Sequence, residues 1–195
     1  SIRGSIQPIL SDCSRRRHEG EEERKMAKAW NLADVAGPKQ ARVTKPEIVA
    51  ALVKKAKRPL LVVGAEILEN GVIDKVIAIG NKGIPVAATA HTIKTFIEKG
   101  FSPVSSDLGV HEVTNLLKDP DWKGFDGKGN YDMVIFLGIN YYLASRMLST
   151  LKHFAPHLRA YSIDRYYHVN AEMSLDNIFE DQKFYEALDV FVSKL

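Results

Sequence analysis

The chain has 195 residues, of which 45% are apolar and 26% charged, and a formal net charge of +3. This length suits one packed domain, and the composition is ordinary for a cytosolic globular protein, so we expect a cytoplasmic location. The single cysteine, Cys13, excludes an internal disulfide and any cluster or zinc site held only by cysteines of this chain. Charges of both signs are interspersed and no apolar run approaches the ~20 residues of a membrane helix, which argues against nucleic acid or a membrane as a partner.

The first part of the chain is predicted to form an arm, and the domain follows it in the sequence. Residues 1–40 contain one expected helix, indicated by the i,i+4 spacing of Glu21 and Lys25, and this helix carries Trp30 on a modest apolar edge. Residues 41–195 are expected to form a single Rossmann-like α/β domain.

The domain is predicted to begin with a helix. Thr44-Lys45-Pro46-Glu47 fits a capping box in which Thr44 is the N-cap and Pro46 lies in the first turn. The apolar face of this helix is expected to contain Ile48, Val49, Leu52, Val53 and Ala56. Residues 60–63 follow as a continuous apolar run, which predicts a strand covered on both faces, as in a parallel sheet.

Strands and helices then alternate along the chain. Further strands are expected at 84–89, 133–137 and 159–164, and further helices at 72–81, 92–99, 108–118, 140–154 and 181–194. Such alternation with short connections predicts an open, doubly wound parallel sheet with helices on both faces. Two of the strands end alike, in Gly64-Ala65-Glu66 and Gly138-Ile139-Asn140, as paired halves of a nucleotide-binding fold do.

A candidate cofactor site follows from this fold, because ligands of open α/β sheets bind beyond the carboxyl ends of the strands where strand order reverses. Glycine there lets the backbone approach a phosphate, helix N-termini supply N–H groups, and an acid such as Asp164 could hold a ribose. No dinucleotide fingerprint and no P-loop pattern occurs, so plain strand-to-helix turns stay open as the alternative for the glycines. The residues at these ends are Gly64, Ala65, Glu66, Thr89, His91, Gly138, Asn140, Asp164 and Arg165.

Other chemistry finds little support in the sequence. Residues 126–132 superficially resemble a calcium loop, but Lys128 occupies the third position and Tyr131 the place of the invariant glycine, which favours a turn. His153 and His157 are separated by a proline and need not share a helical face. No G-x-S-x-G elbow occurs. We therefore expect no catalytic residue and no metal site.

Five segments occur in an order and spacing typical of one family. They are Lys57–Gly64, Gly83–Thr89, Lys118–Trp122, Gly127–Asp132 and Ser162–Tyr166. Together they closely resemble the epsilon-subunit family of the archaeal carbon monoxide dehydrogenase/acetyl-CoA synthase (acetyl-CoA decarbonylase/synthase) complex, from about residue 44 to the C-terminus.

The first two of these segments are also similar to the central domain of thiamine-diphosphate enzymes such as acetolactate synthase. This resemblance implies a DHS-like NAD/FAD-binding domain with a six-stranded parallel sheet, and it raises FAD as a cofactor. FAD-binding relatives tend to carry more glycine after the first strand than Gly64-Ala65-Glu66 provides.

The family resemblance implies an accessory subunit in one-carbon metabolism. In such complexes CO oxidation takes place on a nickel–iron–sulfur cluster of the large alpha subunit, and such clusters need cysteines that this chain lacks. The resemblance implies that the chain stabilises the alpha subunit in an alpha2-epsilon2 assembly with homodimer contacts, and that it assists electron transfer to FAD. The alternative is a stand-alone flavin- or nucleotide-binding enzyme that uses the strand-end crevice.

Exposed aromatic residues are candidates for the surface that meets the partner. Trp122 and Phe125 lie in the turn-rich segment 119–130, and Trp30 lies on the arm. Aromatic anchors are enriched at interfaces, but the two loop rings could equally cover the domain core.

Overall fold

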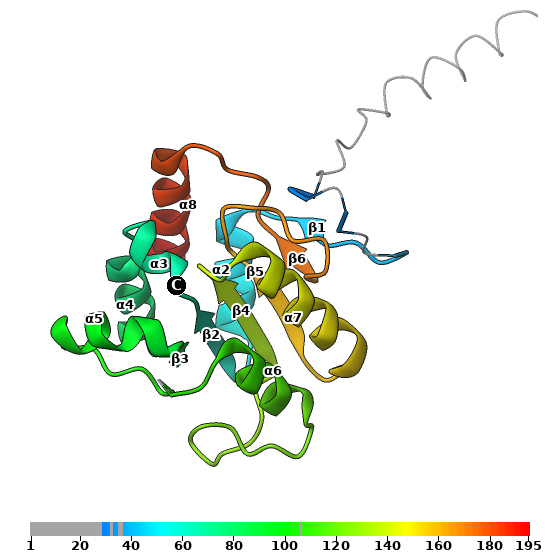
Figure 1. Ribbon diagram of the computed structural model, residues 1–195, viewed down its shortest axis with the longest axis horizontal. Helices are drawn as coiled ribbons and strands as arrows, with labels where there is room; N and C mark the ends of the chain where they lie inside the picture. Colours follow the sequence, from blue (N-terminus) through cyan, green and yellow to red (C-terminus); the bar gives the residue numbers. More distant parts are fainter. Residues whose placement is uncertain (1–28, 32, 35–36, 106) are drawn as a thin grey trace, which may run out of the picture.

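A computed structural model describes residues 29–31, 33–34, 37–105 and 107–195 (Figure 1). All neighbouring strands of its sheet are parallel, which confirms the predicted α/β class and the six-stranded parallel sheet. In spatial order the sheet contains β1 (Arg42–Val43), β6 (Met173–Ser174), β5 (Arg159–Ser162), β4 (Met133–Leu137), β2 (Pro59–Val63) and β3 (Val86–Ala88).

Helices cover both faces of this sheet. One core contains side chains from α2, α4, α5 and α8, and the other contains side chains from α6 and α7, which cross in front of the sheet in Figure 1. The described helices are α2 (Pro46–Lys55), α3 (Glu66–Glu69), α4 (Ile73–Asn81), η1 (Ala90–Thr92), α5 (Ile93–Glu98), α6 (Val110–Lys118), α7 (Tyr141–Phe154) and α8 (Asp181–Lys194). No helix among the described residues is long and apolar enough to cross a membrane.

The central strand β2 shows why its sequence is apolar without alternation. Leu60 and Val62 pack toward α6 and α7, whereas Leu61 and Val63 pack toward α2 and α4, and all four side chains are at most 1% exposed. Successive strand residues point to opposite faces, so a strand that is covered on both sides needs apolar residues at every position. Each such burial contributes roughly 1.5–3 kcal/mol relative to exposure.

Strand order reverses between β2 and β4. The chain passes from β2 outward to β3 and then returns to the other side of β2, where β4, β5 and β6 follow. Val63 pairs with Leu137 at the carboxyl ends of the two central strands. The residues that follow, Gly64 and Gly138, are therefore neighbours at the point where a ligand would be expected.

The predicted capping box before α2 is wrong. Lys45 is the N-cap, with φ −103° and ψ 154°, and no side chain caps the helix, although Pro46 does lie in its first turn. Thr44 instead donates its backbone N–H to the Ser174 carbonyl at 3.0 Å, next to the β1–β6 pair. The predicted apolar face is also wrong at Ile48, which is 48% exposed, because the helix buries Ala50 in its place.

Other differences concern short elements. The strands predicted at 84–89 and 159–164 are shorter in the structure, where they correspond to β3 and β5. The helix α8 spans the residues that were expected. The two-residue strands β1 and β6 and the four-residue helix α3 are too short to produce a readable periodicity. The helix expected in the arm lies mostly outside the described residues.

Candidate functional site

The two strand-end glycines lie against each other. Gly64 donates its N–H to the Leu137 carbonyl at 3.1 Å, and Glu66 donates its N–H to the Gly138 carbonyl at 2.9 Å. A Cβ on Gly64 would lie 2.7 Å from Ile139 Cα, and one on Gly138 would lie 2.8 Å from Ile67 N. Both approaches are closer than a side chain allows. The contact between the two turns is thus a sufficient reason for glycine at both positions, and cofactor binding by them stays a prediction.

Asp164 ties the end of β5 to this contact. Its carboxylate accepts the N–H of Gly138 at 2.9 Å and the N–H of Arg165 at 2.8 Å, and the residue is only 3% exposed. Burial, with a smaller contribution from the charge of Glu66, raises the pKa of Asp164 to about 6, although its backbone hydrogen bonds oppose this shift. The carboxylate therefore holds two neighbouring strand ends together.

The rim of the site contains further predicted residues. Glu66 is half-buried, and its pKa is raised by burial and by Glu69, while a hydrogen bond with Asn140 opposes the shift. Asn140 is exposed and accepts the Tyr142 N–H at 3.2 Å as the N-cap of α7. Arg165 pairs with Asp181 of α8 at 2.5 Å. The predicted residues Gly64, Ala65, Glu66, Gly138, Asn140, Asp164 and Arg165 thus come together at one edge.

Two predicted residues follow the neighbouring strand β3. Thr89 donates its N–H to the Val63 carbonyl at 3.2 Å, which fixes it beside the end of β2. His91 is exposed in η1, and no described contact joins it to the two carboxyl groups of the site. Within the described ranges, no group of three His, Cys, Asp or Glu residues could hold a metal ion.

A group of aromatic side chains continues the same edge, and we name it the aromatic surface: the exposed residues Trp30, Tyr142 and Phe179 and the half-buried Tyr166. The Trp30 ring stacks on Tyr166 with centroids 4.9 Å apart and meets Tyr142 edge-on at 6.1 Å, while Tyr166 and Phe179 are 6.3 Å apart. Trp30 is 41% exposed, Tyr142 55% and Phe179 71%. Of these rings, the sequence suggested only Trp30 as a partner contact, because the four rings come from four separate segments and share no periodicity.

Two buried rings lie next to this surface. Tyr141 meets Trp30 edge-on at 4.9 Å and stacks on His168 at 4.6 Å. Burial, with a smaller contribution from the charge of Asp34, raises the pKa of Tyr141 to about 12, and burial lowers the pKa of His168 to about 4. Both rings are therefore uncharged at neutral pH and form an apolar base for the exposed rings.

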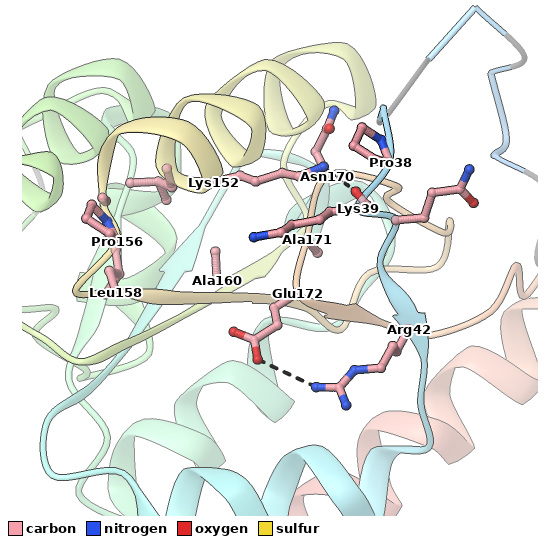
Figure 2. Close-up of a pocket in the computed structure, with 13 residues that line it drawn as sticks. Pro38, Lys39, Arg42, Lys152, Pro156, Leu158, Ala160, Asn170, Ala171 and Glu172 are labelled. Carbon is pink, nitrogen blue, oxygen red and sulfur yellow. Dashed lines mark hydrogen bonds and ion pairs between the residues drawn. The ribbon is translucent and has the colours of Figure 1, made fainter.

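Two cavities lie away from the strand-end residues. One of about 580 Å³ is bordered by the end of α7 and the outer strands (Figure 2), and one of about 440 Å³ lies at the amino ends of β2, β3 and β4, next to Pro59, Pro85 and Tyr131. The predicted strand-end residues line neither of these two cavities.

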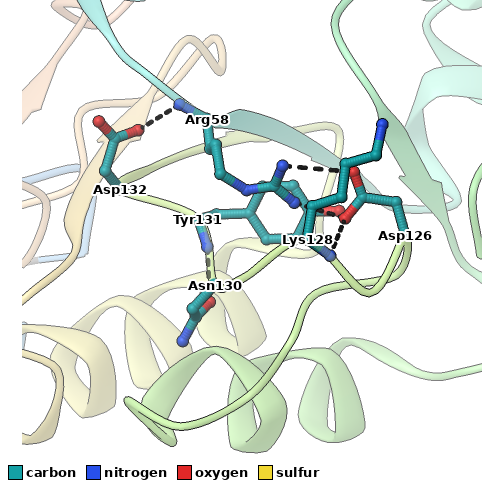
Figure 3. A network of polar contacts seen from close by, with 6 residues as sticks. All are labelled: Arg58, Asp126, Lys128, Asn130, Tyr131 and Asp132. Atoms are coloured by element: carbon teal, nitrogen blue, oxygen red, sulfur yellow. Dashed lines mark hydrogen bonds and ion pairs between the residues drawn. The ribbon is translucent and has the colours of Figure 1, made fainter.

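Residues from four of the five family segments meet at the amino ends of the strands, in what we call the amino-end cluster, whereas the segment Ser162–Tyr166 lies at the carboxyl end of β5. The Asp132 carboxylate accepts the N–H groups of Lys57 and Arg58, each at 2.9 Å. The Arg58 guanidinium donates to Asp126 at 2.5 and 3.3 Å and lies over the Tyr131 ring, as Figure 3 shows. Asp126 also accepts the Lys128 N–H at 3.1 Å, so this loop is held by its own turn and by Arg58.

Aromatic rings complete the amino-end cluster. Trp122 meets Phe125 edge-on at 4.9 Å and Tyr131 at 5.7 Å. Trp122 and Phe125 are half-buried and pack against the core under α6 and α7. This packing favours the interpretation in which the two loop rings cover the core.

The geometry defines an α/β protein with a parallel six-stranded sheet, a tightly closed strand-end contact and an aromatic surface beside it. Comparison with known proteins adds the family. Residues 21–192 match the family described as CO dehydrogenase beta subunit/acetyl-CoA synthase epsilon subunit, so the chain belongs to this family. The predicted resemblance is thereby confirmed.

Curated relatives agree with this assignment. The acetyl-CoA decarbonylase/synthase complex subunit epsilon of Methanothrix soehngenii is 47% identical over 85% of this chain and 90% of the relative. Subunit epsilon 1 of Archaeoglobus fulgidus is 42% identical over 86% of this chain and 91% of the relative. The subunit epsilon of Methanothermobacter thermautotrophicus is 44% identical over 80% of this chain and 89% of the relative.

Proposed function

We propose that the chain is an accessory subunit of a cytoplasmic acetyl-CoA decarbonylase/synthase complex, where it packs on and stabilises the catalytic alpha subunit through the aromatic surface. The observation that supports this proposal is the contact among four aromatic rings, three of which are 41–71% exposed. Contiguous exposed apolar patches mark interaction sites, and aromatic residues are enriched at interfaces. In this role the chain contributes no catalytic centre of its own.

The arm has a part in this proposal. We assign residues 1–40 to an arm and residues 41–195 to the domain, and Trp30 brings the arm onto Tyr141 and Tyr166 of the domain. The surface is thus built jointly by both parts. An alpha2-epsilon2 assembly with homodimer contacts belongs to the same proposal, and light scattering of the reconstituted complex would give its mass.

The proposal is tested by binding of the purified chain to its cognate alpha subunit, measured by analytical ultracentrifugation at micromolar concentrations. Phe179→Ser is expected to weaken binding, because it removes an exposed ring from the aromatic surface. Phe154→Ser is the matched control, since Phe154 is 66% exposed at the opposite end of α7. No association of the wild-type chain, or equal losses in both variants, would contradict the proposal.

A role in electron transfer to FAD is the second function we propose. The observation that favours it is the N-terminus of the 14-residue helix α7, which follows the strand-end glycine Gly138 and begins beside Asp164 and the aromatic surface. Such helix ends attract phosphate, and aromatic rings can stack on a flavin. The half-buried carboxyl of Glu66 at this edge opposes binding of a pyrophosphate when it is charged.

Flavin binding can be tested without disturbing the fold. Replacement of Gly138 is unsuitable, since its φ is +63° and a Cβ would clash with Ile67. Asn140→Asp keeps an N-cap oxygen and adds a negative charge at the helix end. Titration with FAD, followed by flavin fluorescence and thermal stability, is expected to show micromolar binding that this variant weakens. No binding at millimolar FAD, by the chain or by its complex with the alpha subunit, would contradict this second function.

A further inference from the structure

A cleft of about 580 Å³ opens at the end of α7 that is remote from the aromatic surface. It is bordered by residues 38–40 and Arg42, by the last turn of α7 and by the outer part of the sheet at Ala160 and residues 170–172 (Figure 2). This volume lies within the roughly 300–1,000 Å³ of small-molecule sites. None of the residues that line the cleft belongs to the predicted strand-end residues or to the aromatic surface.

Positive charge dominates the polar part of the cleft. Lys39, Arg42 and Lys152 line it against one acid, Glu172. Glu172 pairs with Arg42 at 3.6 Å, and the residues that line the cleft include three basic side chains and one acidic side chain. Figure 2 shows the Lys39 side chain reaching across the cleft above Ala160.

The two lysines are held near each other despite their like charges. The Lys152 ammonium donates to the main-chain carbonyl of Lys39, which fixes it at the rim of the cleft. Burial lowers the pKa of Lys152, and the charge of Lys39 lowers it further. An anion bound between the two ammonium groups would offset this repulsion, as opposite charges at short range do.

The remaining wall of the cleft is apolar. Leu151, Ala155, Leu158 and Ala160 line it and belong to the core under α6 and α7. We propose that this cleft binds a small organic anion, with its phosphate or carboxylate group at Lys39 and Lys152 and its flat apolar body on Leu158 and Ala160. Ligand sites commonly combine an apolar lining with a few convergent polar groups in this way.

Two probes with the same aromatic body test the proposal on the full chain. Anilinonaphthalene sulfonate carries the anionic group, and phenylnaphthylamine lacks it. The anionic probe is expected to bind with one-to-one stoichiometry and at least tenfold more tightly than the neutral probe. Equal affinity for the two probes would overturn the proposal, because the lysines would then contribute nothing.

Matched variants locate the binding. Lys39→Gln combined with Arg42→Gln removes two charges from exposed side chains, so that the fold is retained. It is expected to weaken anionic-probe binding at least tenfold. Lys54→Gln combined with Lys82→Gln changes the net charge equally, at exposed positions outside the cleft, and is expected to have no effect. Equal effects of the two double variants would overturn the proposal, as would loss of probe binding in Trp30→Ala, since the probe would then sit on the aromatic surface.

Competition of AMP or octanoate with the anionic probe distinguishes two classes of ligand. Displacement of the probe by AMP, with octanoate ineffective, would identify a phosphate on a ring system. Displacement by octanoate alone would identify a carboxylate on an acyl chain. Displacement by neither compound at millimolar concentration would contradict the assigned ligand class.

Discussion

Aromatic rings gather at both ends of the sheet, but they are arranged differently. At the amino ends, Trp122 and Phe125 are half-buried against the core, and Arg58 lies over Tyr131. At the carboxyl ends, three rings of the aromatic surface contact Tyr141, and Trp30, Tyr142 and Phe179 are exposed to solvent. The same residue types therefore serve the fold at one end and, in our proposal, a partner at the other.

The aspartates at the two ends of the sheet show the reverse arrangement. In the amino-end cluster, Asp126 is exposed, and its hydrogen bond to Arg58 lowers its pKa. At the carboxyl ends, Asp164 is buried, and its pKa is raised to about 6. Most of the recognisable family segments thus form a structural joint at the amino ends, whereas three of the four rings of the aromatic surface, Trp30, Tyr142 and Phe179, lie outside these segments.

The largest expected effect is at the strand-end contact. Gly138→Ala should lower the free energy of unfolding by about 2–5 kcal/mol, because it combines a left-handed backbone with a clash against Ile67. Gly127→Ala in the amino-end loop is the matched control, with φ +72° and no atom within 4 Å of the added Cβ. It should lose only about 1–2 kcal/mol. Urea denaturation of both variants checks this, and equal losses would show that the contact is not tight.

Between pH 4 and 6.5, two groups near the carboxyl ends, His168 and Asp164, should make the stability of the fold depend on pH. His168 has a folded pKa of about 4, below its ordinary value of 6.5, so its contribution to stability is present above pH 6.5 and is lost as the pH falls toward 4. Asp164 has a raised folded pKa, so its contribution is present below its ordinary pKa of 3.8 and is lost as the pH rises toward 6. Between pH 4 and 6, the contribution of His168 to stability therefore increases with pH, whereas that of Asp164 decreases.

Replacing His168 should leave the contribution of Asp164 to the pH dependence of the free energy of unfolding. Relative to the wild type, His168→Gln should gain roughly 3 kcal/mol of stability between pH 6.5 and pH 4. Urea denaturation across this range checks the difference. A constant difference between variant and wild type would mean that His168 is protonated in the folded protein.

Trp122→Ala tests the amino-end cluster. We expect a loss of about 2–3 kcal/mol in the free energy of unfolding, below that of a fully buried tryptophan, because the ring is half-buried against Phe125 and Tyr131. Affinity for the alpha subunit should be unchanged once the variant is folded. A stability loss under about 0.5 kcal/mol would contradict the structural role of this ring.

Trp30→Ala should behave in the opposite way and have the smallest effect on folding. The melting temperature is expected to stay within about 2 °C of the wild type. The dissociation constant for the alpha subunit should rise about 10–30-fold, as expected when an aromatic anchor of an interface is removed. Calorimetry measures both the melting temperature and the dissociation constant. A fall in stability without a change in affinity would mean that Trp30 supports the fold, as Trp122 and Phe125 do.

Much of the fold could be predicted because the central strands are apolar at every position. The runs ending at Val63 and Leu137 were recognised, and so were the glycines after them. The capping box at Thr44 was misread because pairing beside Ser174 overrides a local signal. The contact between Gly64 and Gly138 depends on the register of β2 with β4, which no single segment encodes.

The candidate site was predicted in part for the same reason. Asp164 and Asn140 could be placed at strand ends, since the carboxyl ends of parallel strands share an edge. The aromatic surface could not be predicted, because Trp30, Tyr142, Tyr166 and Phe179 are brought together only by the folded chain.

Hydrogen–deuterium exchange of the chain, alone and bound to its alpha subunit, shows which of the two aromatic regions contacts the partner. We predict that binding slows exchange in residues 140–146 and 165–180, which surround the aromatic surface, and leaves residues 119–130 unchanged. Protection of residues 119–130, with unchanged exchange at the carboxyl ends, would contradict the account and identify the amino-end cluster as the partner surface.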